Sequence, residues 1–411
     1  MINKSTSSSS WRLGGLLAFV FMQFLGQFLV QVLILPEAHA YPQYIGYGYS
    51  SCLTCHYQPN GGGPLTDYGR AVAATTLAAK PFFVSKLTTD DDLAEYSGVF
   101  GKVETLPDWL RLQGNYWGLW LANGLENNPQ KMWINMQAEG TVIFQFFEDH
   151  HLYFVGTAGY IPPPLEDSPA DQATSSTFIS REHYGAYRWN FSDTESLGLY
   201  VGFMDPAFGI HVPDHEAFLR SATFLNQNDQ SHSIKLDYQT PKMEIQLQGL
   251  LGNLYQDSDV RPKGVTTTGE YEIAKDFRLG GSLWYTNSDF RKRGMEAIHA
   301  RIGFPEGNAV LAQVGLIQDT PLGEDETTQG YVFIQTSYRL ARGLNFLSTF
   351  EYYSAEFFDS VPRTFRFGPA IQYLPFQRLE LRVDLQDTHQ TGVDPTTPDS
   401  YTFLGQVHVW L

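Results

Sequence analysis

From Pro107 to the C-terminus, apolar and polar residues alternate along this chain. Residues 378–386 read Arg-Leu-Glu-Leu-Arg-Val-Asp-Leu-Gln, with four aliphatic residues on one face and charges or amides on the other. Residues 243–248 repeat the scheme. A period of two is that of a β-strand with two unlike faces. The apolar face would cover a core in a soluble sandwich, or face lipid in a membrane barrel.

The spacing of the turns separates these two folds. Sixteen segments have strand character, and the gaps between them alternate between short turns, such as 193–195, and longer loops, such as 205–229. Alternating loop lengths and an even strand number are typical of outer-membrane barrels. The chain also ends on an alternating segment, residues 400–411. We therefore predict an all-β fold over residues 107–411, a transmembrane outer-membrane β-barrel of about sixteen strands in contact with outer-membrane lipid.

Residues 1–40 have the pattern of an export signal. Lys4 and Arg12 precede a largely apolar run from Leu16 to Leu35, and Ala-His-Ala at 38–40 is an A-x-A cleavage site. An uncleaved membrane anchor is the alternative, although three glutamines interrupt the run. Without residues 1–40, the chain has 25 basic and 43 acidic residues, a net charge of −18. This charge disfavours nucleic acid as a partner.

The only two cysteines of the chain, Cys52 and Cys55, belong to the sequence Cys-Leu-Thr-Cys-His, which ends at His56. In such a C-x-x-C-H motif the thiols bind a haem covalently and the imidazole binds its iron. A redox dithiol would stand in a βαβ context, and a zinc site would need further ligands. We predict one covalent haem c in residues 41–106, a small cytochrome c-like plug whose core is largely the cofactor.

The sixth ligand of the iron is not provided near the motif. His56 is the expected proximal ligand through Nε2, and residues 57–131 contain neither histidine nor methionine. The iron is then five-coordinate or takes a ligand from the barrel. The longest loop, 205–229, contains His211 and His215, which are the candidates for the distal position, with Met204 just before them. Solvated loop histidines are the alternative interpretation.

A short segment after the motif carries the remaining candidate. Arg70, with Tyr68, follows the haem motif at a distance suited to a haem propionate, and a guanidinium pairs well with carboxylates. A surface arginine is the alternative. The stretch from Thr66 to Leu77 is predicted to form a short helix, with Thr66 or Asp67 as its N-cap.

In these features the chain resembles the outer-membrane cytochrome–porin fusions, which include iron-oxidising cytochromes. Beside the haem motif, Leu-Thr-Asp-Tyr-Gly-Arg at 65–70 is similar to the Leu-Thr-x-aromatic-Gly-Arg segment of that family. The iron-oxidising members carry Pro-x-Phe-Ala-Arg upstream, where this chain has Pro-Gln-Tyr-Ile-Gly at 42–46. The resemblance implies a haem held in a porin-like barrel, and the departure puts ferrous iron as substrate in doubt.

Together these features predict a protein that transfers electrons across the bacterial outer membrane. A haem would carry the charge, and the barrel would hold it. Expected partners are a periplasmic soluble cytochrome or other carrier at the short-turn side and an external electron donor or acceptor at the long-loop side. An oxidase of an external donor such as Fe(II), and a diffusion porin whose haem is only structural, are the alternatives. The sequence leaves open the direction of electron flow.

Overall fold

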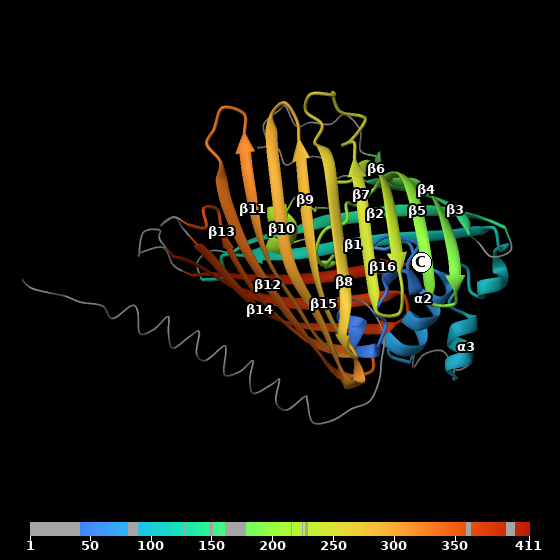
Figure 1. Cartoon of the computed structure of the whole chain (residues 1–411). Coiled ribbons are helices and arrows are strands. Elements are labelled where there is room, and N and C mark those ends of the chain that lie inside the picture. Colours follow the sequence, from blue (N-terminus) through green and yellow to red (C-terminus); the bar gives the residue numbers. More distant parts are fainter. Residues whose placement is uncertain are drawn as a thin grey trace, which may run out of the picture.

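A computed structural model describes residues 42–80, 89–126, 129–147, 151–160, 178–214, 216–223, 225–226, 229–358, 363–391 and 399–411. The predicted export signal, residues 1–40, lies outside these ranges. The described chain forms a β-barrel with a helical segment at one end (Figure 1). Its strands are β1 Leu110–Asn123, β2 Gln130–Phe146, β3 Leu152–Tyr160, β4 Phe178–Ser192, β5 Glu195–Met204, β6 Ser231–Gln239, β7 Met243–Leu250, β8 Lys263–Ala274, β9 Phe277–Asn287, β10 Arg291–Phe304, β11 Asn308–Pro321, β12 Thr327–Ala341, β13 Leu344–Ser354, β14 Arg363–Phe376, β15 Leu379–Thr391 and β16 Ser400–Trp410.

The sheet closes on itself. Every strand pairs antiparallel with the next one in the chain, and β1 pairs with β16 in a register that sets Trp117 opposite His408. Closure gives every strand a partner on both sides, which a sheet in lipid requires because no water is available to an open edge. The predicted fold class and the predicted sixteen strands are confirmed.

The two faces of the wall follow the alternation in the sequence. On β15, Leu381, Val383 and Leu385 face outward and are about 40–50% exposed, whereas Arg382 and Asp384 face the lumen and are buried. Strands β6, β7 and β14 repeat this pattern, with the exposed aliphatic residues Ile234, Leu247 and Ile371 on the outside. Among the described residues, no helix is long and apolar enough to cross a membrane. The outer wall is therefore an apolar belt around a polar interior.

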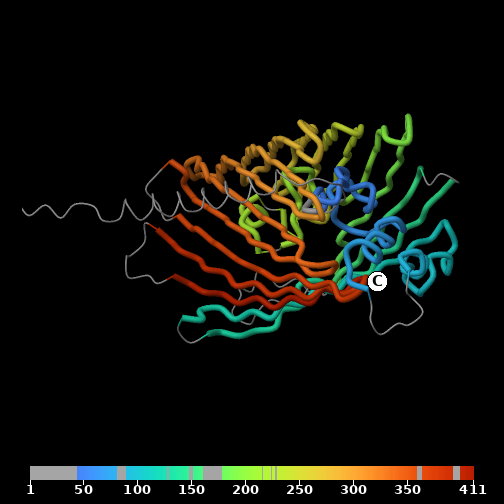
Figure 2. Tube along the Cα trace, turned by 90° about the horizontal axis from the view of Figure 1, so that it is seen from below, coloured from blue at the N-terminus to red at the C-terminus, as the bar shows by residue number. Residues whose placement is uncertain are grey.

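Residues 42–80 and 89–106, here called the plug, lie at the short-turn end of the barrel. Residues 42–80 are surrounded by strands there, and residues 89–106 lie beside them at the end of the barrel (Figure 2). The plug contains 3₁₀ turns η1 Pro42–Tyr47, η2 Cys52–Thr54 and η4 Val103–Thr105, helices α2 Asp67–Val72 and α3 Asp90–Glu95, and a wide helical turn η3 Ala73–Leu77. The short turns of the wall hold its backbone. Arg342 Nε donates to Ala78 O at 2.8 Å, and Ala79 N donates to Leu374 O at 2.8 Å.

The predicted helix after the haem motif is present. Thr66 caps α2 by accepting a hydrogen bond from Gly69 N at 3.1 Å, as a threonine N-cap does. Gly69 packs directly on the motif, since a Cβ at this position would lie 2.3 Å from Cys55 O. The helix thus begins where the sequence indicated, and its glycine lets it touch the Cys55 backbone.

The longest loop folds into the barrel. Between β5 and β6, its described residues run along the lumen and include the short helix α4, Phe218–Thr223, which the sequence did not indicate. Buried apolar residues of this loop pack on apolar residues of the wall; the cluster includes Phe208, Ile210, Val212, Leu219, Leu311 and Phe333. The described part of this loop therefore lies inside the barrel. We call residues 205–223 the inward loop.

Candidate haem site

The haem motif forms one tight turn. Cys55 N and His56 N both donate to Cys52 O, at 3.1 and 2.9 Å. The two thiols and the imidazole therefore project from a single turn of the backbone. A bridge from His56 to Leu65 then joins the motif to the segment before α2. Both cysteines are free thiols rather than a disulfide. The motif therefore keeps the three groups that covalent haem attachment requires.

The two thiols lie in different surroundings. Cys55 is buried among Tyr44, Tyr47 and Tyr49 in the apolar core of the plug. Cys52 instead packs against Gly61, where a Cβ would lie 3.0 Å from its Sγ. Burial raises the pKa of each thiol to about 12, so both are protonated at neutral pH.

The imidazole of His56 is held in its neutral form. Burial lowers the pKa of His56 to about 4, against the opposing effect of the Gly63 and Gly62 carbonyls. Its Nδ1 is buried and has no hydrogen-bond partner. The unpartnered nitrogen is thus Nδ1 rather than Nε2, on which the sequence predicts the iron. A half-turn about the Cβ–Cγ bond exchanges the two nitrogens.

Arg70 is not a surface arginine. It is 5% exposed, and its Nη2 donates to Leu112 O on β1 at 2.6 Å. Burial lowers the pKa of Arg70 to about 10, which leaves it charged at neutral pH. Tyr68, by contrast, is half exposed and hydrogen-bonds to Tyr49. The guanidinium therefore sits between the plug and the wall, where its remaining donors could still reach a carboxylate.

A cavity that is partly open to solvent brings the haem motif and the inward loop together. Its lining comes from the plug (Cys52, Pro59, Asn60), the inward loop (Phe208, Gly209, Ile210, His211) and the wall (Glu244, Gln246, Thr268, Gly269, Glu270, Arg301). Residues more than 150 positions apart in the chain, Cys52 and His211, thus face one space. This juxtaposition joins one of the two haem-attachment cysteines with one distal candidate of the sequence analysis, whereas His56, the proximal candidate, does not line the cavity.

His211 is presented to this cavity as a neutral base. Burial lowers the pKa of His211 to about 4, while the Asp205 carboxylate and the Pro206 carbonyl oppose the shift. Nε2 is buried without a hydrogen-bond partner. The ring nitrogen that meets the Pro206 carbonyl is therefore Nδ1, and a proton there leaves the lone pair on Nε2 free. That is the tautomer in which an imidazole binds a metal.

The other distal candidates are placed differently. His215 lies outside the described residues. Met204 is fully buried in an apolar cluster with Tyr57, Tyr153 and Tyr200, where its side chain packs under the plug. Of the described candidates, His211 alone lines the cavity that Cys52 also lines.

The wall holds the inward loop by its backbone. Four inward-facing side chains bond the loop backbone between residues 205 and 210. Lys235 Nζ donates to Asp205 O at 3.0 Å. Three other side chains accept from backbone amides: Gln248 Oε1 from Ala207 N at 2.8 Å, Ser282 Oγ from Gly209 N at 2.9 Å and Gln313 Oε1 from Ile210 N at 2.6 Å. The plug adds Asn60, whose Nδ2 donates to Pro206 O at 3.1 Å. Irregular backbone in a lumen needs such partners, because it has no strand neighbour.

The sequence did not single out these supporting residues. Asn60, Gln313 and Arg301 belong to ordinary loop or alternating patterns, and nothing local distinguishes them from other polar residues of the lumen. Arg301 is the closest to the motif: its Nη2 donates to Ser50 O at 2.8 Å, and its Nε bonds Glu270 at 2.9 Å. Only the closure of the barrel brings such residues to the plug.

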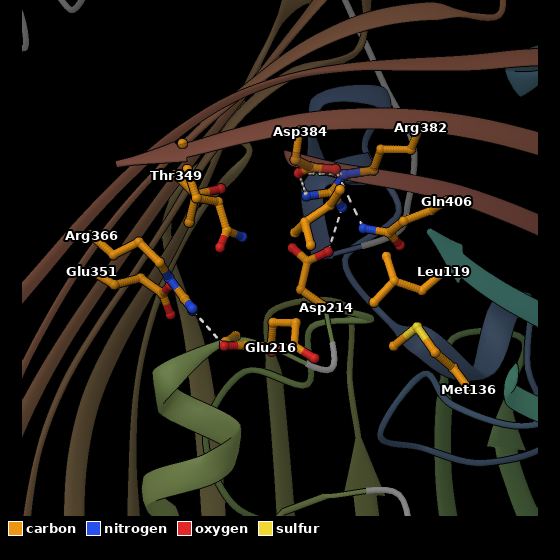
Figure 3. Close-up of a pocket in the computed structure, with 14 residues that line it drawn as sticks. Leu119, Met136, Asp214, Glu216, Thr349, Glu351, Arg366, Arg382, Asp384 and Gln406 are labelled. Carbon is orange, nitrogen blue, oxygen red and sulfur yellow. Dashed lines mark hydrogen bonds and ion pairs between the residues drawn. The ribbon is translucent and has the colours of Figure 1, made fainter. Parts of the chain in front are cut away.

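A second cavity lies between the inward loop and the strands β13–β16, β1 and β2 (Figure 3). Ion pairs cross it. Arg366 Nε bonds Glu351 at 2.7 Å, and Arg382 pairs with Asp384 of its own strand and with Asp214 of the inward loop. Two guanidinium groups thus pair with three carboxylates, of which Asp214 alone belongs to the inward loop. The inward loop is thus fixed to the wall on this side too.

Neither a family model nor a curated protein matches this chain in sequence. Solved structures match it in shape. OmpT of Vibrio cholerae superposes with a TM-score of 0.57 at 8% identity, and the match covers 74% of this chain and 99% of that chain. This chain has the fold of a porin.

Two further porin-like structures agree. The anion-selective porin from Comamonas acidovorans gives a TM-score of 0.53 at 9% identity over 74% of this chain and 99% of that chain. The outer-membrane channel DcaP of Acinetobacter baumannii gives 0.52 at 10% identity over 74% and 97%. At such low identity the likeness concerns the fold alone.

Proposed function

We propose that this protein is an electron conduit of the bacterial outer membrane, in which one covalent haem c is held inside a porin-like barrel. The observation that carries the proposal is the position of His211. The inward loop delivers a neutral imidazole with a free Nε2 to the same cavity as Cys52. A distal ligand there would complete the coordination that the plug alone lacks.

The residues around the motif suit a haem. Cys52 and Cys55 would form the two thioether bonds, His56 would bind the iron on one side and His211 on the other, and Arg70 would face a propionate. The haem supplies the reversible one-electron chemistry when bound. The chain contributes the rest: it keeps both imidazoles neutral, encloses the site in the lumen, and fixes the distal loop to the wall.

The location follows from the wall. A closed barrel with exposed aliphatic side chains outside and buried charges inside is suited to lipid. Since short turns lie on the periplasmic side of such barrels, the plug would face the periplasm. A soluble periplasmic cytochrome or another carrier would then exchange electrons with the haem there. An external donor or acceptor would act from the long-loop side.

A diffusion porin is the second candidate, and the fold similarity favours it. The plug argues against free diffusion, because it occupies the short-turn end of the lumen and is hydrogen-bonded to several turns of the wall. In planar bilayers, a conduit should show little ionic conductance, and a porin should conduct freely. An oxidase of external Fe(II) would differ from both by Fe(II)-dependent reduction of the haem in whole cells.

The decisive experiment is low-temperature EPR of the oxidised protein, with His211→Ala and His215→Ala as variants. We expect a low-spin haem in the wild type that becomes high-spin in His211→Ala and is restored by added imidazole. His215→Ala, a loop histidine of the same type, is the matched control and should keep the low-spin signal. Unchanged spectra in both variants would refute ligation by the inward loop. A wild type without covalent haem would refute the conduit itself.

A further inference from the structure

We infer that Gln313 is a positioning residue for the sixth haem ligand, because its side-chain amide fixes the backbone immediately before His211. The inference rests on the proposed function, since His211 has to bind the iron for its position to matter. Gln313 lies on the lumen face of β11 and is 3% exposed. Its Oε1 accepts a hydrogen bond from Ile210 N at 2.6 Å, so the peptide that leads into His211 is held by the wall.

A second residue orients this amide. Gln313 Nε2 donates to the hydroxyl oxygen of Tyr331 at 2.6 Å. A primary amide presents donors on one side and an acceptor on the other, so a partner for Nε2 turns Oε1 toward the loop. Tyr331 is itself immobile: it is 1% exposed, and its ring lies on Gly315, where a Cβ would come within 2.4 Å of the ring.

The loop is shaped to receive this amide. Gly209 has a φ of +62°, in the left-handed region, and a Cβ there would lie 2.5 Å from both Gln313 amide heavy atoms. Only glycine permits that approach without a shift of Gln313. Five residues therefore form one chain of contacts. Gly315 leaves room for the Tyr331 ring, Tyr331 orients the Gln313 amide, and Gln313 holds the backbone of Gly209 and Ile210.

Within the loop, Arg220 Nη1 donates to the carbonyl directly after His211, Val212 O, at 3.2 Å. The other contacts that come from the wall act farther from His211 than Gln313 does. Ser282 bonds Gly209 N, and Gln335 Nε2 bonds Asp214 Oδ2 at 2.9 Å, three residues beyond the histidine. Gln313 is bonded to the residue directly before His211. Without its acceptor, the buried Ile210 amide loses its partner, and the loop relaxes to find another. The residues that support a metal ligand have to hold it within about 0.5 Å of its position. A shift of the loop should therefore weaken or break the bond between His211 and the iron.

The test uses the full-length, haem-loaded protein and the EPR signal of the oxidised iron. We expect Gln313→Leu to convert at least half of the low-spin haem to high-spin and to let carbon monoxide bind the reduced haem. Tyr331→Phe should act in the same direction and more weakly. Gln313→Glu should retain the low-spin signal of the wild type, since a carboxylate can accept hydrogen bonds from both the Ile210 amide and the Tyr331 hydroxyl.

Gln372→Leu is the matched control. Gln372 is a buried glutamine of β14 that bonds Asn345 at 3.0 Å and Glu380 at 2.7 Å, both on the wall. Heat-modifiable migration on gels confirms that each barrel is folded. The inference is overturned if Gln313→Leu keeps the wild-type spectrum while His211→Ala does not, or if Gln372→Leu changes it equally. An unchanged spectrum in His211→Ala instead overturns the ligand assignment on which the inference rests.

Discussion

The barrel wall and the segments inside it satisfy their backbones in opposite ways. In the wall, each strand bonds the next, and the side chains are free to face lipid or lumen. In the plug and the inward loop, the backbone is irregular, and wall side chains supply its partners, as Arg342 does for Ala78 and Gln313 for Ile210. The wall is thus stabilised by repetition, whereas the interior depends on individual contacts. Single substitutions should therefore affect the interior more than the wall.

The largest expected effect separates the cofactor from the wall. Cys52→Ser with Cys55→Ser should abolish covalent haem completely, because no other cysteine can form a thioether. The barrel should still assemble, because its strands are paired without the plug. Haem staining on denaturing gels and heat-modifiable migration measure the two effects. A variant that retains bound haem on the denaturing gel would contradict the motif assignment.

Next in size is the buried ion pair beneath the motif. Arg301→Met leaves the Glu270 carboxylate buried without its guanidinium and removes the hydrogen bond to Ser50 O. Removal of one partner from a buried pair destabilises a protein by about 3–5 kcal/mol. Urea unfolding should show this loss, and the double variant Arg301→Met, Glu270→Gln should recover much of it. Equal stability of the two variants would show that the pair is not buried as described.

A single substitution in the wall should lower the folding stability strongly only where it places a charge against lipid. Val383→Arg places a charge on the outer face of β15, with a cost of about 2–4 kcal/mol near the bilayer midplane. Val383→Leu is the control and should change little. Folding free energies in phospholipid vesicles provide the measurement. If Val383→Arg folds as stably as Val383→Leu, the apolar belt does not face hydrocarbon.

The smallest effect concerns a surface contact of the plug. The Arg342 guanidinium, 2.9 Å from the Asp90 carboxylate, lowers the pKa of Asp90 below its usual value of 3.8. The contribution of this pair is present above the unfolded-state pKa and lost as pH falls through the lower folded value. Because Asp90 is exposed, Asp90→Asn should cost no more than about 0.5 kcal/mol. The stability difference from wild type should therefore shrink as the pH falls below 3.8, and a difference that grows there would contradict the prediction.

The sequence predicted the wall well, and the interior only in part. The alternation around Val383 was enough to assign faces, and the alternating loop lengths were enough to count strands. The haem motif at Cys52 and the helix after Thr66 were also predictable, because each has a local pattern. Nothing in the sequence distinguished His211 from a solvated histidine, and nothing marked Gln313.

By itself, the sequence determined which residues could bind a haem and which face of each strand is apolar. Both are local properties, set by spacing and by a period of two. The tertiary structure decided which residues surround the motif. His211 faces the cavity of Cys52 because the apolar residues of its loop pack on the inner face of the wall and wall side chains bond its backbone. Contacts between strands far apart in the chain carry no period, so only closure of the barrel reveals them.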